Sequence, residues 1–432
     1  MQMSSMSALI ERAKLVTASP RWDLEKRFPV VADRAEGCHV WDANGDRYID
    51  YTSCSGAAPL GIGHPSVVQA AIDALQRGGI VPNTLSLPRI ETAESLLSFF
   101  PGTERVRFFR TGSCATTAAV RISRVHTGRR LVLTSGFHGW HDWHLQSAFG
   151  GLPGRDPETV DFGYDLEQLS TLLSERWQEV ACVIVTPEVC FFSHDYHIEL
   201  AQLVRSHGCL LVLDEVMTGF RYDQGGYATA AGIQPDLFTL SKGLANGIAL
   251  SAVAGRGEIF DGAESAYLGY TYQREVMPFA AAKASLEVFR SGEPFTAMKK
   301  VGTVLIEGLN RLFERSAVPA IAFGWPSMFR VLFVNDDIGQ EFYAGLLRRG
   351  VLIEYGGVHM ISAATSDQDL AYTLEAAEES LNEVLRTARP EVGRSGPTSV
   401  TDEHVFALAE RAFGATRNTL QKWCTARSGV QR

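Results

Sequence analysis

The sequence predicts an α/β protein with a large domain built on a mostly parallel central sheet and a smaller α/β domain after it. Between residues 105 and 260, short continuous apolar runs alternate with segments of helical periodicity. Strands that are apolar along their whole length belong to parallel sheets covered on both faces. Two further apolar runs, 323–335 and 350–363, flank a helical segment at 339–350 and predict the smaller domain.

The elements follow in order along the chain. Residues 37–51 predict a β-hairpin, because apolar and aromatic residues alternate on both sides of an Asn-Gly turn at 44–45. A Gly/Pro-rich connector at 56–65 leads into a helical pattern over 66–76. The strand candidates of the large domain are 106–110, 130–135, 181–187, 209–215 and 237–242. In such a sheet, ligands bind at the turns that follow the carboxyl ends of the strands.

Composition shifts predict the domain boundaries. We expect an N-terminal segment with the hairpin (1–65), a large domain (66–300), a small domain (301–388), and a linker with a C-terminal helix (389–432). Pro, Gly and Ser dominate residues 389–399, as in a linker. Residues 401–423 predict one amphipathic helix, with Val405, Leu408, Ala409 and Phe413 at helical spacing.

Bulk composition excludes several classes of protein. The chain has 432 residues, 45% hydrophobic and 21% charged, as in ordinary globular proteins. No apolar run reaches the ~18 residues of a membrane span, and the first residues lack the pattern of a secretory signal, so we expect a cytoplasmic location. A net charge of −9 argues against nucleic-acid binding and is compatible with a cationic substrate. Seven cysteines without CxxC spacing argue against a disulfide framework or a zinc site.

Asp214 is the first candidate for chemistry. A buried strand delivers it to its carboxyl end, where a carboxylate is costly unless it is paired. A pyridinium nitrogen is a suitable partner, since a carboxylate beside it keeps the ring an electron sink. Val216, two residues on, points to the same side and can pack under such a ring. An Asp that caps the following helix would leave the same local pattern.

Lys242 ends another apolar strand, 28 residues after Asp214. Gly243 and Gly247 let the backbone pass close to a ligand. A lysine at the rim of a dry pocket gives up its proton readily, so it can form an imine and carry protons. By itself, however, the pattern also fits a solvated lysine at a strand end.

A third segment, 107–128, runs from a strand through a Thr-Gly-Ser turn into a helix that begins near Ala115. The N–H groups at a helix N-terminus bind phosphate, and the Ser113 hydroxyl adds a donor. An ordinary strand–turn–helix capped by Thr111 or Ser113 is the alternative.

A fourth segment, 135–144, places Phe137 after a strand, where its ring can stack on a planar ligand. His138, His141 and His144 follow with a spacing that suggests a metal site. The surrounding Gly and Trp residues indicate a loop, and no nearby Cys or second acid completes a ligand set, so we expect no metal.

In this order and spacing, the four segments resemble the fold-type I pyridoxal-phosphate enzymes. More narrowly they resemble the class III aminotransferases, the branch that contains glutamate-1-semialdehyde aminomutase. The resemblance covers roughly residues 20–385. Its most specific motif is LDEVMTGFR, and YIDY, GHP, FHG, PDLFTLSKG and HMISAATSDQDL agree with it in order.

The resemblance implies a role for each matched residue. Lys242 holds pyridoxal 5'-phosphate as a Schiff base. Asp214 pairs with the pyridine nitrogen, and Val216 packs on one face of the ring. Phe137 stacks on the other face, with His138 beside it.

The resemblance also implies how the phosphate is bound. Gly112 and Ser113 hold it in a turn that here reads TGSCA in place of the usual SGTEA, with Cys114 instead of the acid. Thr271 resembles the threonine that reaches the phosphate from the neighbouring subunit. The resemblance therefore implies an obligate homodimer with shared active sites.

Departures from the family pattern bear on the substrate. The usual VEP reads VTPE, so Thr186 replaces the glutamate and Glu188 follows. The family usually offers an arginine to a substrate carboxylate, but residues 350–363 contain none, and the nearest candidates are Arg110 and Arg274. We therefore favour a neutral or cationic amine, such as an amino sugar, as substrate.

Two acidic residues are candidates to meet the ammonium groups of such a substrate, Glu188 and Glu354. Enzymes of aminoglycoside antibiotic biosynthesis resemble this branch, and both transaminases and amine epimerases occur among them.

Cys54 supports an alternative reaction. It lies where the family pattern SWGP reads SCSGAAP, and Ala57 replaces the tryptophan, which opens space over the cofactor. Transamination needs only Lys242 as proton shuttle. Epimerisation, or an aminomutase reaction, needs a second group on the opposite face, and a thiol of near-neutral pKa can serve. Cys54 also fits a small buried apolar residue.

Other classes of function remain to be weighed. A sensor or regulator with this fold would need a DNA-binding extension or a basic domain, and the sequence has neither. A decarboxylase or an oxidase that uses the same cofactor is chemically possible. The expectation of amine transfer comes from the resemblance.

Overall fold

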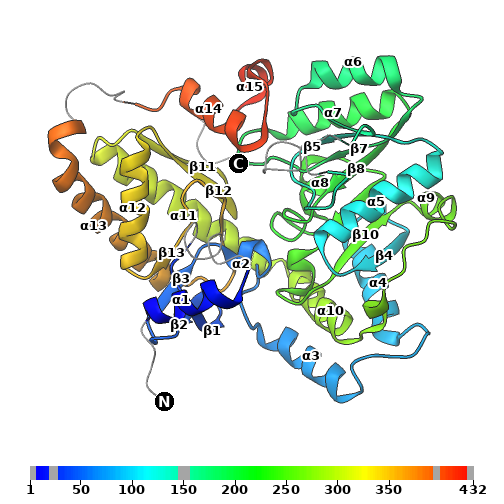
Figure 1. Ribbon diagram of the computed structural model, residues 1–432, viewed down its shortest axis with the longest axis horizontal. Coiled ribbons are helices and arrows are strands. Elements are labelled where there is room, and N and C mark those ends of the chain that lie inside the picture. The colour runs from blue at the N-terminus through cyan, green and yellow to red at the C-terminus, as the bar shows by residue number, and fades with distance from the viewer. Residues whose placement is uncertain (1–5, 19–27, 145–155, 393–398, 426–432) are drawn as a thin grey trace. The chain divides into compact units, whose positions relative to one another are not determined.

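The computed structural model describes residues 6–18, 28–144, 156–392 and 399–425. The chain forms two compact units (Figure 1). The small unit comprises Met1–His64 and Met298–Val400, and the large unit comprises Pro65–Ala297 and Thr401–Arg432. The predicted N-terminal hairpin therefore belongs to the same unit as the C-terminal domain, and the residues after Val400 belong to the large unit.

The large unit contains a seven-stranded sheet in the order β4-β10-β9-β8-β7-β5-β6. Its strands are β4 (Arg105–Phe109), β5 (Leu131–Ser135), β6 (Thr159–Asp161), β7 (Val180–Val185), β8 (Leu210–Asp214), β9 (Leu237–Leu240) and β10 (Ser251–Gly255). Only β10 runs antiparallel to its neighbours, and the other six strands share one direction. The expectation of a mostly parallel sheet is confirmed.

Helices cover this sheet on both faces (Figure 1). α5 (Gly112–Thr127) packs on one face through the small buried residues Ala115, Ala118 and Ala119, which let it approach the strands closely. α6 (Leu166–Arg176) and α7 (His194–Ser206) lie along the other face. All six residues of β7 are buried, as expected for a strand covered on both sides.

The remaining elements of the large unit surround this core. They are α3 (Pro65–Gln76), α4 (Leu87–Phe99), α8 (Gly226–Ala231), α9 (Gly257–Asp261), α10 (Met277–Arg290), α14 (Asp402–Phe413), α15 (Arg417–Trp423) and the 3₁₀ turns η3 (Lys242–Ala245) and η4 (Thr271–Arg274). Within the described residues, no helix is both long enough and apolar enough to span a membrane.

The small unit has two sheets, in the orders β1-β2-β3-β13 and β11-β12-β14. Their strands are β1 (Ala32–Glu36), β2 (His39–Asp42), β3 (Arg47–Asp50), β11 (Ala320–Trp325), β12 (Met328–Phe333), β13 (Val351–Leu352) and β14 (His359–Met360). The helices are α1 (Met6–Val16), α2 (Ser53–Gly56), α11 (Glu293–Arg315), α12 (Asp336–Arg348) and α13 (Asp367–Val392). Phe313, Phe333 and Phe342 form an aromatic cluster in its core.

Two apolar runs of the small unit contain more strands than runs, and the single helix expected over 401–423 is wrong. Residues 323–335 are not one strand: they fall in the antiparallel pair β11 and β12, which turns back after Trp325, at Pro326 and Ser327. Residues 350–363 supply two short strands, β13 and β14, to different sheets. Residues 401–423 form two helices rather than one, because Gly414 takes a left-handed conformation that ends α14. In the predicted linker, α13 runs to Val392, and residues 393–398 lie outside the described residues.

Candidate active site

The predicted cofactor residues gather at one edge of the large-unit sheet. Five strands that share a direction end there, and each is followed within a few residues by a candidate. The pairs are β4 with Gly112 and Ser113, β5 with Phe137 and His138, β7 with Thr186 and Glu188, β8 with Asp214, and β9 with Lys242. Parallel alignment of the strands therefore brings together residues that are up to 130 positions apart in sequence.

Asp214 is buried at the centre of this edge and is held from several sides. Its Oδ2 lies 2.7 Å from Nδ1 of His138, and Thr186 Oγ1 donates to the same oxygen at 3.4 Å. Oδ1 accepts hydrogen bonds from Thr239 Oγ1 at 2.7 Å and from the backbone N–H of Val216 at 3.1 Å. These contacts fix the carboxylate in one orientation.

Two of the three histidines in residues 138–144 contact each other, and the third contacts Thr117. The His138 backbone N–H donates to Nε2 of His144 at 2.9 Å, whereas Nδ1 of His141 lies 2.7 Å from Thr117 Oγ1. Burial lowers the pKa of His144 to about 3, with a smaller effect from His138. His144 is therefore a neutral acceptor that supports the His138 backbone.

The turn before α5 has the geometry of an anion site. The helix begins at Gly112, and its N-cap, Thr111, accepts the Cys114 N–H at 3.2 Å. The first N–H groups of any helix lack partners within the helix and are available to an anion. Ser113 Oγ accepts the Trp140 N–H at 3.3 Å. A Cβ added to Gly112 would come within 2.9 Å of Val216, so the turn lies directly against that side chain.

Phe137 and Val216 offer apolar surface at the same edge. Phe137 is 48% exposed although it is a large aromatic residue, and Val216 is half-buried. Thr186 Oγ1 donates to the Phe137 carbonyl at 3.1 Å, which ties the loop after β5 to the loop after β7.

Lys242 has an unusual backbone. Its φ is +43°, in the left-handed region that non-glycine residues avoid, and it lies at the start of η3, separated from the end of β9 by Ser241. Left-handed non-glycine residues are strained and cluster at functional sites. The side chain is half-buried.

Taken together, these residues fit pyridoxal phosphate. A buried carboxylate, already paired with an imidazole, suits the pyridine nitrogen. A half-exposed aromatic ring suits the planar cofactor, and a helix N-terminus with an adjacent serine suits its phosphate. A lysine supplies the amine that attaches the cofactor covalently.

Cys54 lies in the small unit, in a turn of unusual conformation. Ser53, Cys54 and Ser55 all have positive φ, at +47°, +53° and +57°. Asp50 holds the turn: its carboxylate accepts the Thr52 N–H at 2.7 Å, the Thr52 hydroxyl at 2.6 Å and the Cys54 N–H at 3.2 Å.

The predicted properties of Cys54 need correction in two respects. Its side chain is exposed, not buried, so it is not an apolar core residue. The thiol itself is partly withdrawn from water although the residue is exposed overall, and this, followed by the charge of Asp50, raises its pKa to about 11. This direction is opposite to the near-neutral pKa that was expected, and the catalytic role of Cys54 stays a prediction. The place of Cys54 relative to Lys242 stays a prediction, as does that of Glu354, which is half-buried in the same unit.

The candidates for substrate binding differ in their surroundings. Glu188 is half-buried just after β7, and its Oε1 accepts the Cys190 N–H at 3.2 Å. Arg110 forms an ion pair with Glu275 and donates to the Ala249 carbonyl at 3.1 Å. Because Arg110 is neutralised by Glu275, it is poorly placed to bind a substrate carboxylate. Arg274 lies at the end of η4, and its backbone carbonyl accepts the Val81 N–H at 3.1 Å.

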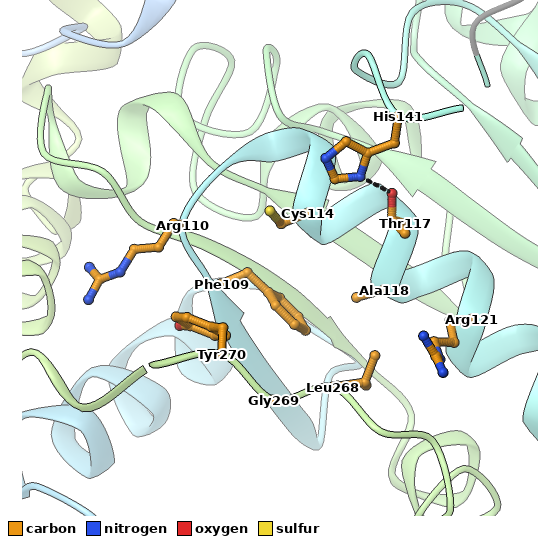
Figure 2. A pocket seen from close by; sticks show the side chains of 10 residues that line it. All are labelled: Phe109, Arg110, Cys114, Thr117, Ala118, Arg121, His141, Leu268, Gly269 and Tyr270. Atoms are coloured by element: carbon orange, nitrogen blue, oxygen red, sulfur yellow. Dashed lines mark hydrogen bonds between the residues drawn. The ribbon is translucent and has the colours of Figure 1, made fainter. Parts of the chain in front are cut away.

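A pocket of about 270 Å³ adjoins the start of α5 (Figure 2). Cys114 lines it, together with side chains of α5, the end of β4 and residues 268–270. Thr271, the first residue of η4, directly follows this lining and is exposed. The thiol of Cys114 accepts the Thr111 hydroxyl at 3.1 Å, so Cys114 contributes to the cap of the phosphate turn as well.

Sequence reasoning missed three residues that shape this site. Thr239 lies opposite Asp214 in the parallel pairing of β8 with β9. Aligning these two predicted strands as parallel neighbours could have identified it. Tyr164 donates its hydroxyl to the Thr186 carbonyl at 2.8 Å, and no motif marks it. Glu215 is fully buried and accepts the N–H groups of Tyr227 and Ala228, both at 2.8 Å.

Comparisons with known proteins identify the family. The family model for class-III aminotransferases matches residues 22–381. The 2'-deamino-2'-hydroxyneamine transaminase of Streptomyces kanamyceticus is 39% identical, over 80% of this chain and 89% of that protein. The glutamate-1-semialdehyde 2,1-aminomutase of Methanothermobacter thermautotrophicus is 32% identical, over 82% of this chain and 92% of that protein.

A solved structure agrees with these relatives. The pyridoxal-phosphate form of the FumI protein from Sphingopyxis sp. MTA144 superposes with a TM-score of 0.83 at 27% identity, over 89% of this chain and 97% of that one. The fold-type I architecture expected from the sequence is thereby confirmed. The chain is a pyridoxal-phosphate-dependent enzyme and belongs to the class-III aminotransferase family.

Proposed function

We propose that the enzyme transfers the amino group of an amino sugar that lacks a carboxylate. The observation that carries this proposal is the 39% identical transaminase for 2'-deamino-2'-hydroxyneamine, an amine with several amino and hydroxyl groups and no carboxylate. The pairing of Arg110 with Glu275 supports it, because that arginine is neutralised. Glu188, at the carboxyl edge of the sheet, is an acidic partner for ammonium groups of the substrate.

In this proposal each residue at the sheet edge has a defined task. Pyridoxal phosphate, when bound, supplies a carbonyl that accepts the substrate nitrogen and a ring that takes up the electron pair left by a departing proton. Lys242 Nζ anchors the cofactor between turnovers and, once released, moves that proton in a 1,3-shift. Asp214 holds a negative charge at the pyridine nitrogen, and His138 orients Asp214.

Other residues hold the cofactor in place. Gly112, Ser113 and the first turn of α5, with Cys114, bind the phosphate through N–H groups and a hydroxyl. Phe137 and Val216 cover the two ring faces and exclude water from them.

A second candidate function is epimerisation of an amine carbon, with Cys54 opposite Lys242. The strained, exposed turn at Cys54 favours it, since such strain is characteristic of functional sites. The raised pKa keeps the thiol protonated at neutral pH, which is the form that gives a proton but not the form that removes one.

We also propose a homodimer in which Thr271 reaches the phosphate of the neighbouring subunit. Thr271 is exposed, and the residues around it include the strongly exposed aromatic side chains of Tyr267 and Tyr272. Apolar surface of this kind is characteristic of protein interfaces. Mixing the inactive variants Lys242→Ala and Thr271→Ala should restore activity in hybrid dimers. Failure to recover any activity from the mixture, or a monomer in sedimentation, would contradict shared sites.

The proposed reaction is tested with neamine as amino donor. We expect neamine to convert the bound cofactor from its pyridoxal to its pyridoxamine absorbance, and pyruvate to reverse this change. Lys242→Ala should lose both the change and borohydride trapping of the cofactor on the chain. Activity confined to α-amino acids, and lost in Arg274→Ala, would overturn the proposal.

The two candidate reactions are separated by isotope exchange. A chiral amino sugar is incubated with the enzyme in deuterated water without a keto acid. Inversion with deuterium uptake that disappears in Cys54→Ala would establish epimerisation. Full cofactor conversion without inversion would exclude it.

A further inference from the structure

The C-terminal segment 414–425, which contains α15, lies beyond the residues that match the family model. It belongs to the large unit although α13, before it, belongs to the small unit. Within the large unit it packs beside α6 and α7 (Figure 1). The match to the family model therefore does not indicate what this segment does.

One end of the segment is fixed at the start of α6. Thr416 caps α15 and donates its hydroxyl to Asp165 Oδ2 at 2.7 Å. The other oxygen of Asp165 caps α6. Gly163 lies so close that a Cβ there would come within 2.7 Å of the Gly414 carbonyl. The N-termini of α6 and α15 are therefore linked through the carboxylate of Asp165.

The other end is fixed to the loop after β7. The Thr425 N–H donates to the Phe191 carbonyl at 2.9 Å, and Cys424 forms an antiparallel bridge with Phe192. The Trp423 ring meets the edge of Tyr196, with 5.8 Å between centroids. Phe191 and Phe192 are fully buried, and the contacts with Cys424 and Thr425 help to hold their backbone.

The same loop carries the proposed substrate residue. The Phe192 N–H donates to the Glu188 carbonyl at 3.2 Å, so the bridge to Cys424 lies one hydrogen bond from Glu188. The Phe192 ring stacks on Tyr196 at 4.4 Å.

A second series of contacts runs from Tyr196 through Tyr164 to Thr186, at the beginning of the loop. The Tyr196 hydroxyl donates to the Tyr164 carbonyl at 2.6 Å, and the Tyr164 hydroxyl donates to the Thr186 carbonyl at 2.8 Å. Tyr164 has a φ of +59°, a strained conformation that surrounding contacts must maintain. The C-terminal segment therefore contacts the loop 186–192 directly at Phe191 and Phe192, and is linked to Thr186 only through Tyr196 and Tyr164.

We propose that the segment 414–425 is a positioning element for the substrate loop, and that Trp423 is its main positioning residue. It fixes Glu188 where additional ammonium groups of an amino sugar bind. Asp214 depends mainly on His138, Thr239 and the Val216 N–H, and its contact with Thr186 of the loop is the longest of its four, at 3.4 Å. This inference rests on the proposed function. It predicts that damage to the segment weakens binding of polycationic amines and leaves the cofactor site intact.

The test compares Trp423→Ala with Trp177→Ala, a matched tryptophan variant at the far end of α6 that does not touch the loop. The probes are neamine, with several amino groups, and 6-amino-6-deoxyglucose, with one. In Trp423→Ala we expect the neamine concentration for half-maximal cofactor conversion to rise about tenfold. The value for 6-amino-6-deoxyglucose should stay within about twofold. Trp423→Phe should restore most of the neamine affinity, and Trp177→Ala should resemble the wild type.

A second readout does not depend on catalysis. Hydrogen exchange of the peptide covering residues 186–192 should accelerate in Trp423→Ala, and the peptides of β8 and β9 should be unchanged. Unchanged exchange in the loop, or equal loss of affinity for both probes, would overturn the positioning role. If neamine fails to convert the wild-type cofactor, the proposed function fails, and the exchange experiment still decides whether the segment positions the loop.

Discussion

The carboxyl edge of the large-unit sheet and the turn at Asp50–Gly56 in the small unit both contain strained backbone. Lys242 is left-handed at the first, and Ser53, Cys54 and Ser55 at the second. At the sheet edge, Asp214 is held by His138, Thr239 and Thr186, which come from three other segments. In the turn, the contacts of the Cys54 backbone are local: the Asp50 carboxylate accepts its N–H, and its carbonyl accepts the Ala57 N–H at 3.2 Å.

The two regions are therefore stabilised in different ways, one by contacts from distant segments and the other by contacts within the turn. Contacts from distant segments exist only when the whole sheet is folded, so the geometry of Asp214 is as stable as the fold. A left-handed non-glycine residue costs about 1–2 kcal/mol, and in the turn short-range hydrogen bonds from Asp50 and along the backbone help to offset this cost. The turn is therefore the region that a single substitution can alter without disturbing the fold.

The largest effect is expected from Asp214→Asn. The amide keeps the acceptor for Thr239 but removes the negative charge from the pyridine nitrogen, so we expect kcat to fall about 10²- to 10³-fold. Thr239→Val, which removes one of the four hydrogen bonds, should cost far less. Steady-state rates with neamine and pyruvate measure both. Equal losses in the two variants would show that orientation, and not charge, is what Asp214 provides.

Glu215, next to Asp214, is a second buried carboxylate at this edge, and its protonation is expected to affect the stability of the fold. Burial raises its pKa from 4.5 to about 7, although hydrogen bonds from Ala228, Tyr227 and Thr218 oppose the shift. Because the folded-state pKa is the higher one, protonation favours the folded state. This stabilisation is fully present below pH 4.5 and is lost as the pH rises through about 7.

Glu215→Gln should remove this pH dependence. Between pH 4.5 and 7.5, the unfolding free energy of the wild type should fall by about 3 kcal/mol relative to the variant. Urea unfolding at several pH values, with saturating pyridoxal phosphate, measures the difference. Parallel pH profiles for the two proteins would mean that Glu215 titrates normally.

The smallest effect is expected from Asp50→Asn in the small unit. The pKa of Cys54 is raised by loss of water and, to a smaller extent, by the charge of Asp50. Removing that charge should lower the pKa and speed alkylation of Cys54 by iodoacetamide at pH 8.5 by a few-fold. Mass spectrometry of the Cys54 peptide measures the rate, and the Cys114 peptide is the control. A slower reaction would show that Asp50 acts by exposing the thiol.

The motif residues of the large unit could be predicted because each follows a strand whose apolar run is visible locally. The pairing of those strands in one direction then brings Lys242, Asp214 and Phe137 to the same edge. The division of residues 401–423 into two helices has a local signal in Gly414, but their docking on the large unit could not be predicted, because the partners Asp165 and Tyr196 lie more than 200 positions away. Periodicity shows that a helix has an apolar face but not which surface covers it.

The sequence alone determined the family and the cofactor and predicted the residues that hold it, since these depend on local motifs in a fixed order. Only the tertiary structure decided that Thr239 and Thr186 share Asp214, that Glu275 pairs with Arg110, and that the surroundings of Cys54 raise the pKa of its thiol. These properties arise from burial and from charges brought close by packing. No local pattern encodes them, because the free energy of a charge depends on every group that surrounds it in the folded chain.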